Sequence, residues 1–424
     1  MPFRFDVPII FSPMSASLPT AFVVFGATGD LMARKIAPAL FQLHAEHRLP
    51  ADFRLIGFAR RDWSDEDFRV HVRGILRGHA PRADAESVDA FLGRCAYVRG
   101  HFEAPEGYDR LRRDIQGQNA LLYLSVPTAS VPPILSQFSR LCIGRRPGAW
   151  TRVMLEKPIG WDGESARALD AALAGCFAEE QIYRVDHYLA KDALRALAGF
   201  RFADGPGEPR WNAERVARIR VRLWETLGVE KRGAFYDRLG ALRDVGQNHL
   251  LEMLAYATME KPASFDAAPV RARRVELLRG LVPPQPAETF RAQYEGYRAI
   301  VGVDPASDTE TYFRAKTWLS PRRWQGVEII LEAGKRMPET RKDVVVTFKD
   351  GSSKTFDFDY SRQARAQYVV EYESLFLAAF AGDQTPFLSV EEIDALWAWT
   401  DPIERAWRNN ETPLGTYAPG TEPV

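Results

Sequence analysis

An apolar run that leads directly into a glycine turn and then a helical pattern constrains the fold of this chain more than any other feature. Ala21-Phe-Val-Val-Phe25 suits a buried parallel strand, and Gly26-Ala-Thr-Gly-Asp-Leu31 follows it at once. Leucine and isoleucine then recur at helical spacing through Leu49. A strand, a tight turn and a helix in this order place backbone N–H groups and a helix N-terminus against a pyrophosphate.

The glycine turn therefore predicts a dinucleotide cofactor. Its pattern is Gly-x-x-Gly and lacks the third glycine of the full fingerprint, so a purely structural turn is the alternative. The candidate cofactor-binding residues are Gly26, Thr28, Gly29, Asp30 and Leu31.

The second strand, Phe53 to Phe58, ends in two arginines that bear on the choice of cofactor. An NAD enzyme places an acid near this position for the ribose hydroxyl, whereas this chain has Arg60 and Arg61. A guanidinium group binds phosphate with two parallel hydrogen bonds, which suits a 2′-phosphate. NADP is therefore expected as the cofactor, with NAD possible and a surface arginine pair as the alternative explanation.

Strands and helices continue to alternate up to residue 185, which predicts a doubly wound parallel sheet. Further strands are expected at 121–125, 152–156 and 182–185, with helices near 65–77, 84–94, 106–117, 129–140 and 163–175. Ligands of such sheets bind beyond the carboxyl ends of the strands. The motifs that follow strands are Gly26–Asp30, Arg60–Arg61, Glu156–Pro158 and Asp186–His187, and they are expected to converge on one edge.

After the Gly/Pro-rich link at 205–209 the pattern changes to consecutive strands. Arg218 to Leu223 alternates polar and apolar residues, and more strands are expected at 311–319, 327–331, 344–348 and 354–360, with helices at 247–258, 365–381 and 390–407. The fold class is thus an α/β N-terminal Rossmann-like domain plus an α+β C-terminal domain with a large, mostly antiparallel sheet. One face of that sheet should pack on helices and the other is free to be an interface.

Composition excludes several classes of protein. Lysine plus arginine (56) balances aspartate plus glutamate (56), which gives no support for nucleic acid or a membrane surface as a partner. Three scattered cysteines fit a reducing compartment, and no metal-ligand spacing appears. No apolar run approaches the length of a membrane span. A cytoplasmic protein without a metal site is expected.

Arg184-Val-Asp-His-Tyr-Leu-Ala-Lys191 concentrates an acid, an imidazole, a phenol and an ammonium group. If the stretch continues as a helix, His187 and Lys191 share one face, and two cations there predict an anion opposite them. A solvated helix start capped by Asp186 is the plain alternative. His249 is expected to open a helix, anchored by its apolar face and presented by an exposed end, although a lone histidine there is more often structural. Glu225 and Asp244 are candidate hydroxyl-binding acids, and Lys335 follows a strand end.

Taken together, these blocks resemble the glucose-6-phosphate dehydrogenase family. The matching blocks are Gly26–Leu31, Glu156-Lys-Pro-Ile-Gly160, Arg184–Lys191, Lys231-Arg-Gly233, Arg243-Asp-Val-Gly-Gln-Asn-His-Leu-Leu251, Gln293-Tyr294, Trp324-x-Gly326 and Gly334-Lys335. They run in the family's order from about residue 21 to about 405. The resemblance implies oxidation of a sugar 6-phosphate at C1 to a lactone, with hydride transfer to NADP, by a homodimer or homotetramer.

The resemblance also implies roles for single residues. His249 corresponds to the general base, Asp186 to the acid that orients it, and Lys157 to a residue between substrate and nicotinamide. The remaining substrate-binding candidates are His187, Tyr188, Lys191, Glu225, Asp244, Lys335 and Arg341. The implied domains are an arm at 1–20, a dinucleotide-binding domain at 21–186 and a substrate-binding and oligomerisation domain at 187–424.

Two of the departures from the family pattern bear on the phosphate site and on the assembly. Thr340 stands where a second cation is usual, so either Arg341 takes over that role or the phosphate is held more weakly. The segment between Val346 and Tyr360 is shorter than usual, which bears on the oligomer and on a second, structural NADP site. Two alternatives stay open: a sugar oxidoreductase of the glucose–fructose oxidoreductase type, and a non-catalytic homologue that binds a sugar phosphate.

Overall fold

The computed structural model describes residues 18–202, 210–358 and 367–423. The chain forms two compact units. The first comprises residues 1–154, 176–182 and 376–383, and the second comprises 155–175, 183–375 and 384–424. The expected arm lies mostly outside the described residues, and the expected domain limits at 20/21 and 186/187 stay predictions.

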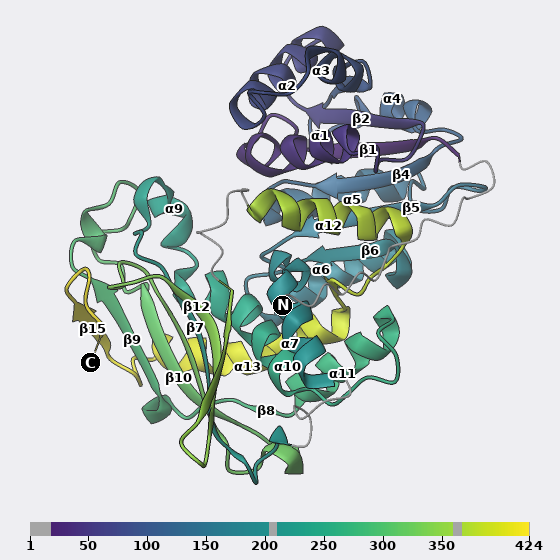
Figure 1. The fold of residues 1–424 in the computed structure, drawn as a ribbon. Coiled ribbons are helices and arrows are strands. Elements are labelled where there is room, and N and C mark those ends of the chain that lie inside the picture. Colours follow the sequence, from purple (N-terminus) through teal and green to yellow (C-terminus); the bar gives the residue numbers. More distant parts are fainter. Residues whose placement is uncertain (1–17, 203–209, 359–366, 424) are drawn as a thin grey trace. The chain divides into compact units, whose positions relative to one another are not determined.

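The first unit is built on a parallel sheet with the strand order β5-β4-β1-β2-β3. The strands are β1 (Thr20–Phe25), β2 (Phe53–Ala59), β3 (Cys95–Arg99), β4 (Asn119–Leu124) and β5 (Thr151–Glu156). The helices between them are a π-turn η1 (Met32–Ile36), α1 (Ala37–Ala45), α2 (Asp65–His79), α3 (Ala85–Leu92), α4 (Tyr108–Asp114) and α5 (Val131–Arg140). Figure 1 shows α1, α2 and α3 grouped on the β2 side of this sheet.

The continuous apolar strands form because both of their faces are covered. All six residues of β1 are buried, as are all six of β4. Phe25 of β1 lies opposite Phe58 of β2 and Leu124 of β4. The glycine turn and Arg60 therefore lie at the same carboxyl edge of the sheet, as expected for these two motifs.

The second unit contains a large sheet with the order β13-β12-β7-β11-β10-β9-β15. Its strands are β7 (Val216–Trp224), β9 (Thr289–Tyr294), β10 (Tyr312–Leu319), β11 (Glu328–Gly334), β12 (Arg341–Phe348), β13 (Ser353–Asp357) and β15 (Leu414–Tyr417), and β8 (Leu281–Val282) pairs with β10. The β7–β11 and β9–β15 pairs are parallel and the other pairs are antiparallel. The sheet is thus mostly antiparallel, as expected; the last residues of the expected strand 354–360 lie outside the described residues.

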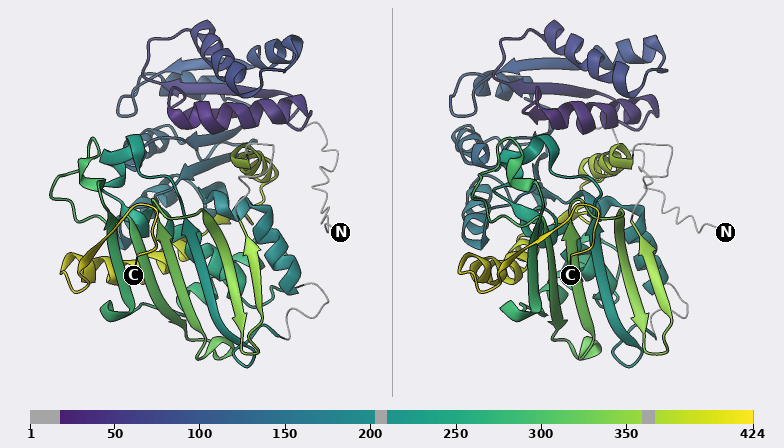
Figure 2. Two further views of the ribbon diagram at one scale, coloured as in Figure 1. Left: turned by 60° about the vertical axis from the view of Figure 1, so that its left-hand side comes forward. Right: turned by 90° about the vertical axis from the view of Figure 1, so that its left-hand side faces the viewer.

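Helices cover one face of this sheet. They include α7 (Asp192–Phe202), a π-helix η6 (Leu242–Leu250), α10 (Leu251–Thr258), α11 (Ala267–Arg279) and α13 (Val390–Arg408). Figure 2 shows the strands with these helices behind them and no described helix across the opposite face. Alternation along β7 and β12 explains the difference, since Ile219, Val221, Val344 and Val346 are fully buried on the helix-covered face. The prediction of one covered and one open face is confirmed for the described residues.

The second unit also contains the strand β6, the turn that follows it and several shorter elements. They are α6 (Gly163–Cys176), β6 (Ile182–Val185), a 3-10 turn η4 (His187–Ala190), α9 (Gly233–Tyr236), α12 (Gln367–Ala381, which spans the division between units) and β14 (Phe387–Leu388), which pairs antiparallel with β6. None of the helices that the structure describes is both long and apolar enough to cross a membrane.

Candidate active site

A buried polar contact of the second unit joins Asp186 to His249. Asp186 follows β6 and its Oδ1 accepts a hydrogen bond from the backbone N–H of Tyr188 at 2.9 Å, which caps the short η4 turn. The same oxygen lies 2.6 Å from His249 Nδ1. Asp186 thus caps the turn, as the alternative of a capped helix start predicted, and is also the partner of His249. The cap is buried and not solvated, since Asp186 is 1 % exposed.

The conditional helix that would place His187 and Lys191 on one face is not formed. The η4 turn ends at Ala190, Lys191 has extended backbone angles, and α7 begins only at Asp192. His187 and Lys191 nevertheless meet a common anion. His187 Nδ1 lies 2.6 Å from Glu371 Oε2, and Lys191 Nζ donates to Glu371 Oε1 at 2.6 Å. The two basic groups and burial act on Glu371 in opposite senses: burial favours the neutral acid, but His187 and Lys191 outweigh it and lower the Glu371 pKa.

His249 was expected to open a helix and to be presented at its exposed end. It lies instead inside a longer helix. It is the eighth residue of the π-helix η6, which continues into α10, and it is 2 % exposed. A π-helix has i→i+5 hydrogen bonds, so residues five apart share a face, and Asp244 therefore faces the same way as His249. Gly246 in this helix allows close packing, because a Cβ there would lie 2.7 Å from Cζ of Phe313.

Rings fix the orientation of the His249 imidazole. The Tyr188 ring stacks on it with a centroid distance of 4.0 Å, and the His187 ring meets it edge-on at 4.8 Å. Lys191 Nζ lies 4.6 Å from the centroid of the Tyr188 ring. Asp186, His187, Tyr188, Lys191 and His249 are therefore brought together as one cluster, as expected for a shared site.

A second cluster, of three lysines and two carboxylates, adjoins the same π-helix. Lys157 Nζ donates to the backbone carbonyl of Asp244 and lies 3.5 Å from Asp244 Oδ1. Lys335 Nζ contacts Glu225 and lies 4.0 Å from Asp244 Oδ2, and Lys342 Nζ lies 3.9 Å from Glu225 Oε1. Burial favours the neutral acid at Asp244, but Lys157 and Lys335 outweigh burial and hold its pKa at about 2.

The sheet positions the second cluster. Trp224 lies opposite Gly334 where the parallel strands β7 and β11 end, so Glu225 and Lys335 leave the sheet side by side. In β12, Arg341 pairs with Trp224, whereas Lys342 pairs with Leu223 on the helix-covered face. Arg341 instead contacts Glu339 and is not brought together with the other candidates. The sequence did indicate that Lys342 lies on the helix-covered face, because residues two apart in a strand share a face and Val344 and Val346 are buried.

The protonation states of the dyad follow from burial and charge. Burial lowers the pKa of His249 to about 3, although Asp186 acts in the opposite direction. Burial opposes ionisation of Asp186, yet His249, with His187 and Lys157, holds the Asp186 pKa at about 2. At neutral pH the carboxylate can only accept a hydrogen bond, so the neutral imidazole carries its proton on Nδ1 and leaves Nε2 as an acceptor.

We predict from these pKa values that the His249 ring stays neutral, as the Nδ1–H tautomer, at pH values down to about 4. Nitrogen–proton correlation spectra of uniformly ¹⁵N-labelled protein, with the signal assigned by its absence from His249→Asn, measure this directly. The unfolded chain protonates His249 below pH 6.5, whereas the folded protein does so only near 3. The contribution of His249 to stability is therefore present above pH 6.5 and is lost as the pH falls toward 3. Protonation of the ring between pH 6 and 7 would contradict the assignment.

The first unit contains the glycine turn at which a cofactor cradle is expected. Gly26 has φ +84°, and a Cβ there would lie 2.4 Å from the carbonyl oxygen of Ser125. The Gly29 N–H donates to the Gly26 carbonyl at 2.9 Å, which closes the turn, and Thr28 and Leu31 are partly exposed beside it. Only glycine fits the left-handed backbone and close strand approach at Gly26, as a phosphate cradle requires. The exposed Asp30 pairs with Arg34 at 3.1 Å.

Arg60 and Arg61 are both exposed where β2 ends. The Arg61 guanidinium lies 5.0 Å from the ring of Trp63, and the Arg61 backbone carbonyl accepts a hydrogen bond from Tyr97. Arg60 follows the carboxyl end of β2, at the same sheet edge as the glycine turn. The residues present therefore fit a dinucleotide cofactor.

Comparisons with known proteins agree with this arrangement. Residues 23–195 match a family model described as the NAD binding domain of glucose-6-phosphate dehydrogenase, and residues 198–357 and 351–423 match its C-terminal domain. Glucose-6-phosphate 1-dehydrogenase of Chlamydia muridarum is 31 % identical, over 96 % of this chain and 94 % of the relative. Glucose-6-phosphate 1-dehydrogenase 6, cytoplasmic, of Arabidopsis thaliana is 31 % identical, over 95 % of this chain and 88 % of the relative.

A solved structure of glucose-6-phosphate dehydrogenase in complex with its substrate glucose-6-phosphate superposes with a TM-score of 0.87. It is 29 % identical and the match covers 97 % of both chains. The fold class expected from the sequence is thereby confirmed.

Proposed function

Because this chain belongs to the glucose-6-phosphate dehydrogenase family, we propose that it oxidises glucose 6-phosphate at C1 to the 6-phosphoglucono-lactone. The observation that carries the proposal is the buried Asp186–His249 pair, joined at 2.6 Å, in which a neutral imidazole is held in one tautomer. His249 Nε2 takes the proton from the C1 hydroxyl as the C1–H bond breaks. The nicotinamide cofactor, when bound, accepts the hydride.

Asp186 stabilises the imidazolium that forms and keeps the ring in place without taking up the proton itself. Tyr188 restrains the ring from one face. Since Asp244 lies on the same face of the π-helix as His249, its carboxylate and Glu225 are suited to hold sugar hydroxyls, with Lys157 and Lys335 fixing those acids.

We assign the substrate phosphate to His187, Tyr188 and Lys191. Glu371 contacts both His187 and Lys191 and competes with an incoming phosphate for their N–H groups. The sheet register places Lys342 on the helix-covered face, where the candidate site lies. We therefore propose Lys342, and not Arg341, as the second cation of the substrate site. Glu371 and Lys342 were not recognised from the sequence.

The direct test is an initial-rate panel of glucose 6-phosphate, other hexose 6-phosphates and free glucose, each with NADP and NAD. Absorbance of the reduced cofactor should rise most steeply with glucose 6-phosphate and NADP. No reduction with any hexose 6-phosphate would refute the proposal. Faster oxidation of free glucose would revive the glucose–fructose oxidoreductase alternative, which the comparisons do not favour.

We infer that NADP is preferred over NAD because Arg60 and Arg61 stand at the edge that carries the glycine turn. Replacing Arg60 with alanine should weaken NADP binding by about 10-fold or more, as expected for the loss of a charge-assisted hydrogen bond, and leave NAD unaffected. KM values for both cofactors measure this. Arg82→Ala, which removes an exposed arginine elsewhere in the first unit, is the control. An equal loss for NADP and NAD would remove the 2′-phosphate from the assignment.

We also propose that the open face of the second-unit sheet joins two copies of the chain. Its side chains include Arg218 and Lys316, which pair with Glu328, so the face is polar and charged. Light scattering after size exclusion should give a mass twice that of one chain. The variant Ile330→Glu, on this face, should lower the measured mass toward that of one chain. A monomer in the unmodified protein would exclude the proposal. A cytoplasmic location stays a prediction.

A further inference from the structure

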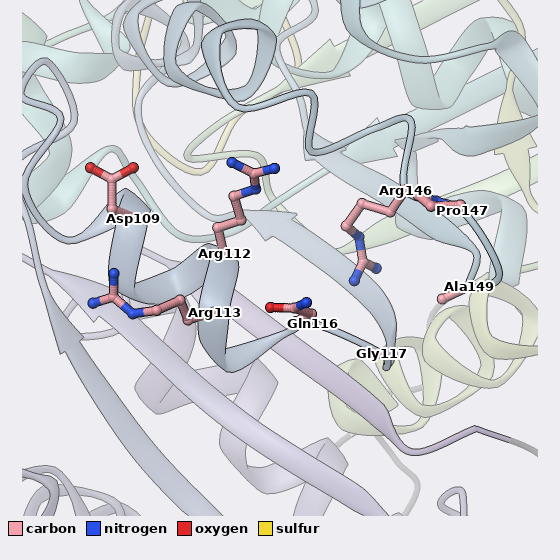
Figure 3. A pocket seen from close by; sticks show the side chains of 8 residues that line it. All are labelled: Asp109, Arg112, Arg113, Gln116, Gly117, Arg146, Pro147 and Ala149. Carbon is pink, nitrogen blue, oxygen red and sulfur yellow. The ribbon is translucent and has the colours of Figure 1, made fainter.

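A pocket of about 800 Å³ lies in the first unit, and none of its lining residues is among those assigned above. Its lining residues are Asp109, Arg112, Arg113, Gln116, Gly117, Arg146, Pro147 and Ala149. They come from α4, from the turn that follows it, and from the loop that leads into β5. Figure 3 shows Arg146 on one side of the pocket, Arg113 and Asp109 on the other, and Gln116 between them.

The pocket lies at the opposite edge of the sheet from the cofactor cradle. It precedes β4, which begins at Asn119, whereas the glycine turn follows the carboxyl end of the neighbouring parallel strand β1. Six residues of strand separate the two edges by about 20 Å. A ligand in this pocket would therefore not overlap a dinucleotide at Gly26.

Three guanidinium groups in this pocket lack a carboxylate partner within the described part of the chain. Arg112 and Arg113 are exposed and form no ion pair or side-chain hydrogen bond there. Arg146 is partly buried, and its three hydrogen bonds go to neutral oxygens: the Thr151 hydroxyl at 2.9 Å and the carbonyls of Ile115 at 2.6 Å and Trp150 at 3.3 Å.

The charge of Arg146 is thus held in place but not neutralised. Burial lowers the pKa of Arg146, and an anion in the pocket would offset that unfavourable burial. The one acid of the lining, Asp109, is directed to Arg140, from whose Nη2 its Oδ1 lies 3.5 Å away. The lining therefore carries a local excess of positive charge in a chain whose net charge is zero.

We propose that this pocket is a binding site for a small polyanion that carries two or more phosphate groups. A single phosphate would engage one or two guanidinium forks, whereas three forks spread over a pocket of this size suit a longer anion. No aromatic side chain lines the pocket, so it offers no stacking surface for a nucleobase. A phosphorylated metabolite and an inorganic polyphosphate share the required chemistry.

Calorimetric titration with tripolyphosphate and, separately, with fructose 1,6-bisphosphate tests the proposal. Both titrations are made with saturating NADPH and glucose 6-phosphate, which cannot react together because the cofactor is already reduced. These occupants keep the probe out of the cofactor and substrate sites. One saturable site per chain is expected for at least one probe. Tighter binding of tripolyphosphate indicates an inorganic polyphosphate as the ligand, and tighter binding of fructose 1,6-bisphosphate indicates a phosphorylated metabolite.

The variant Arg112→Gln/Arg113→Gln should raise the Kd by about tenfold or more, because it removes two guanidinium groups that would form charge-assisted hydrogen bonds with the anion. Both side chains are exposed and unpaired, so folding should be unaffected. The matched control, Arg77→Gln/Arg82→Gln, removes two exposed arginines of the same unit outside the pocket. No saturable binding, an unchanged Kd in the pocket variant, or an equal loss in the control would each overturn the proposal. The site does not depend on the proposed reaction, because the pocket variant should retain full oxidation of glucose 6-phosphate if that reaction occurs.

Discussion

Replacing His249 with asparagine is expected to lower kcat for glucose 6-phosphate oxidation by about 10²–10⁴-fold, the usual contribution of a positioned general base. Asparagine is polar and smaller than histidine, so it can still hydrogen-bond to Asp186 within the same buried space. The Kd for glucose 6-phosphate should stay nearly unchanged, since Lys191, His187 and the carboxylates remain. Initial rates give kcat, and calorimetry without cofactor gives the Kd.

His79→Asn is a suitable control, because His79 is exposed at the end of α2 and belongs to neither cluster. It should retain full activity. A His249 variant whose substrate affinity falls as steeply as its rate would show that His249 forms part of the pocket wall and does not act as the base.

Replacing Asp186 with asparagine should have an effect of similar or larger size, about 10⁴-fold on kcat, by analogy with other buried histidine–carboxylate pairs. The introduced amide can donate a hydrogen bond to His249 Nδ1, which would place the imidazole proton on Nε2 and remove the acceptor. Rates at pH 7, together with the tautomer seen in nitrogen–proton spectra, should change in the same variant.

Asp186 also caps η4, so a loss of activity could reflect a damaged fold, and a second buried aspartate provides the comparison. Asp170 is 8 % exposed and lies 2.7 Å from the Arg184 guanidinium. Asp170→Asn should lower the melting temperature without changing the tautomer of His249 or the order of magnitude of kcat. If it lowers kcat as much as Asp186→Asn does, the dyad interpretation fails.

Elements whose pattern is local could be predicted from the sequence. The strands at 21–25 and 53–58 have continuous apolar runs because both faces are buried, and the observed β1 and β2 agree with them within about one residue. Elements with mixed composition were missed, including β3, β9 and α11. Helix α11 carries four arginines, and Arg274 among them is fully buried against Glu392. Composition suggests solvent exposure for such a residue, and only its distant partner makes burial favourable.

In the candidate site, too, contacts between residues far apart in the sequence could not be predicted from local patterns. The Asp186–His249 contact was anticipated through the family resemblance and not from spacing, since 63 residues separate the partners. Glu371 lies 184 residues from His187, and no local pattern links them. Lys342, which we propose in preference to Arg341, is different, because strand parity alone would have favoured it.

The site depends on the hydrogen-bond period of the π-helix η6 as well as on residue identity. An α-helix advances about 100° per residue, so residues five apart lie about 140° apart around it, whereas i→i+5 bonding brings Asp244 and His249 to nearly the same face. A change of η6 to α-helical bonding would therefore turn the imidazole away from the Asp244 carboxylate, in a chain that still contains every candidate residue. The reactive geometry depends on the winding of one helix, which a position-by-position comparison of side chains would overlook.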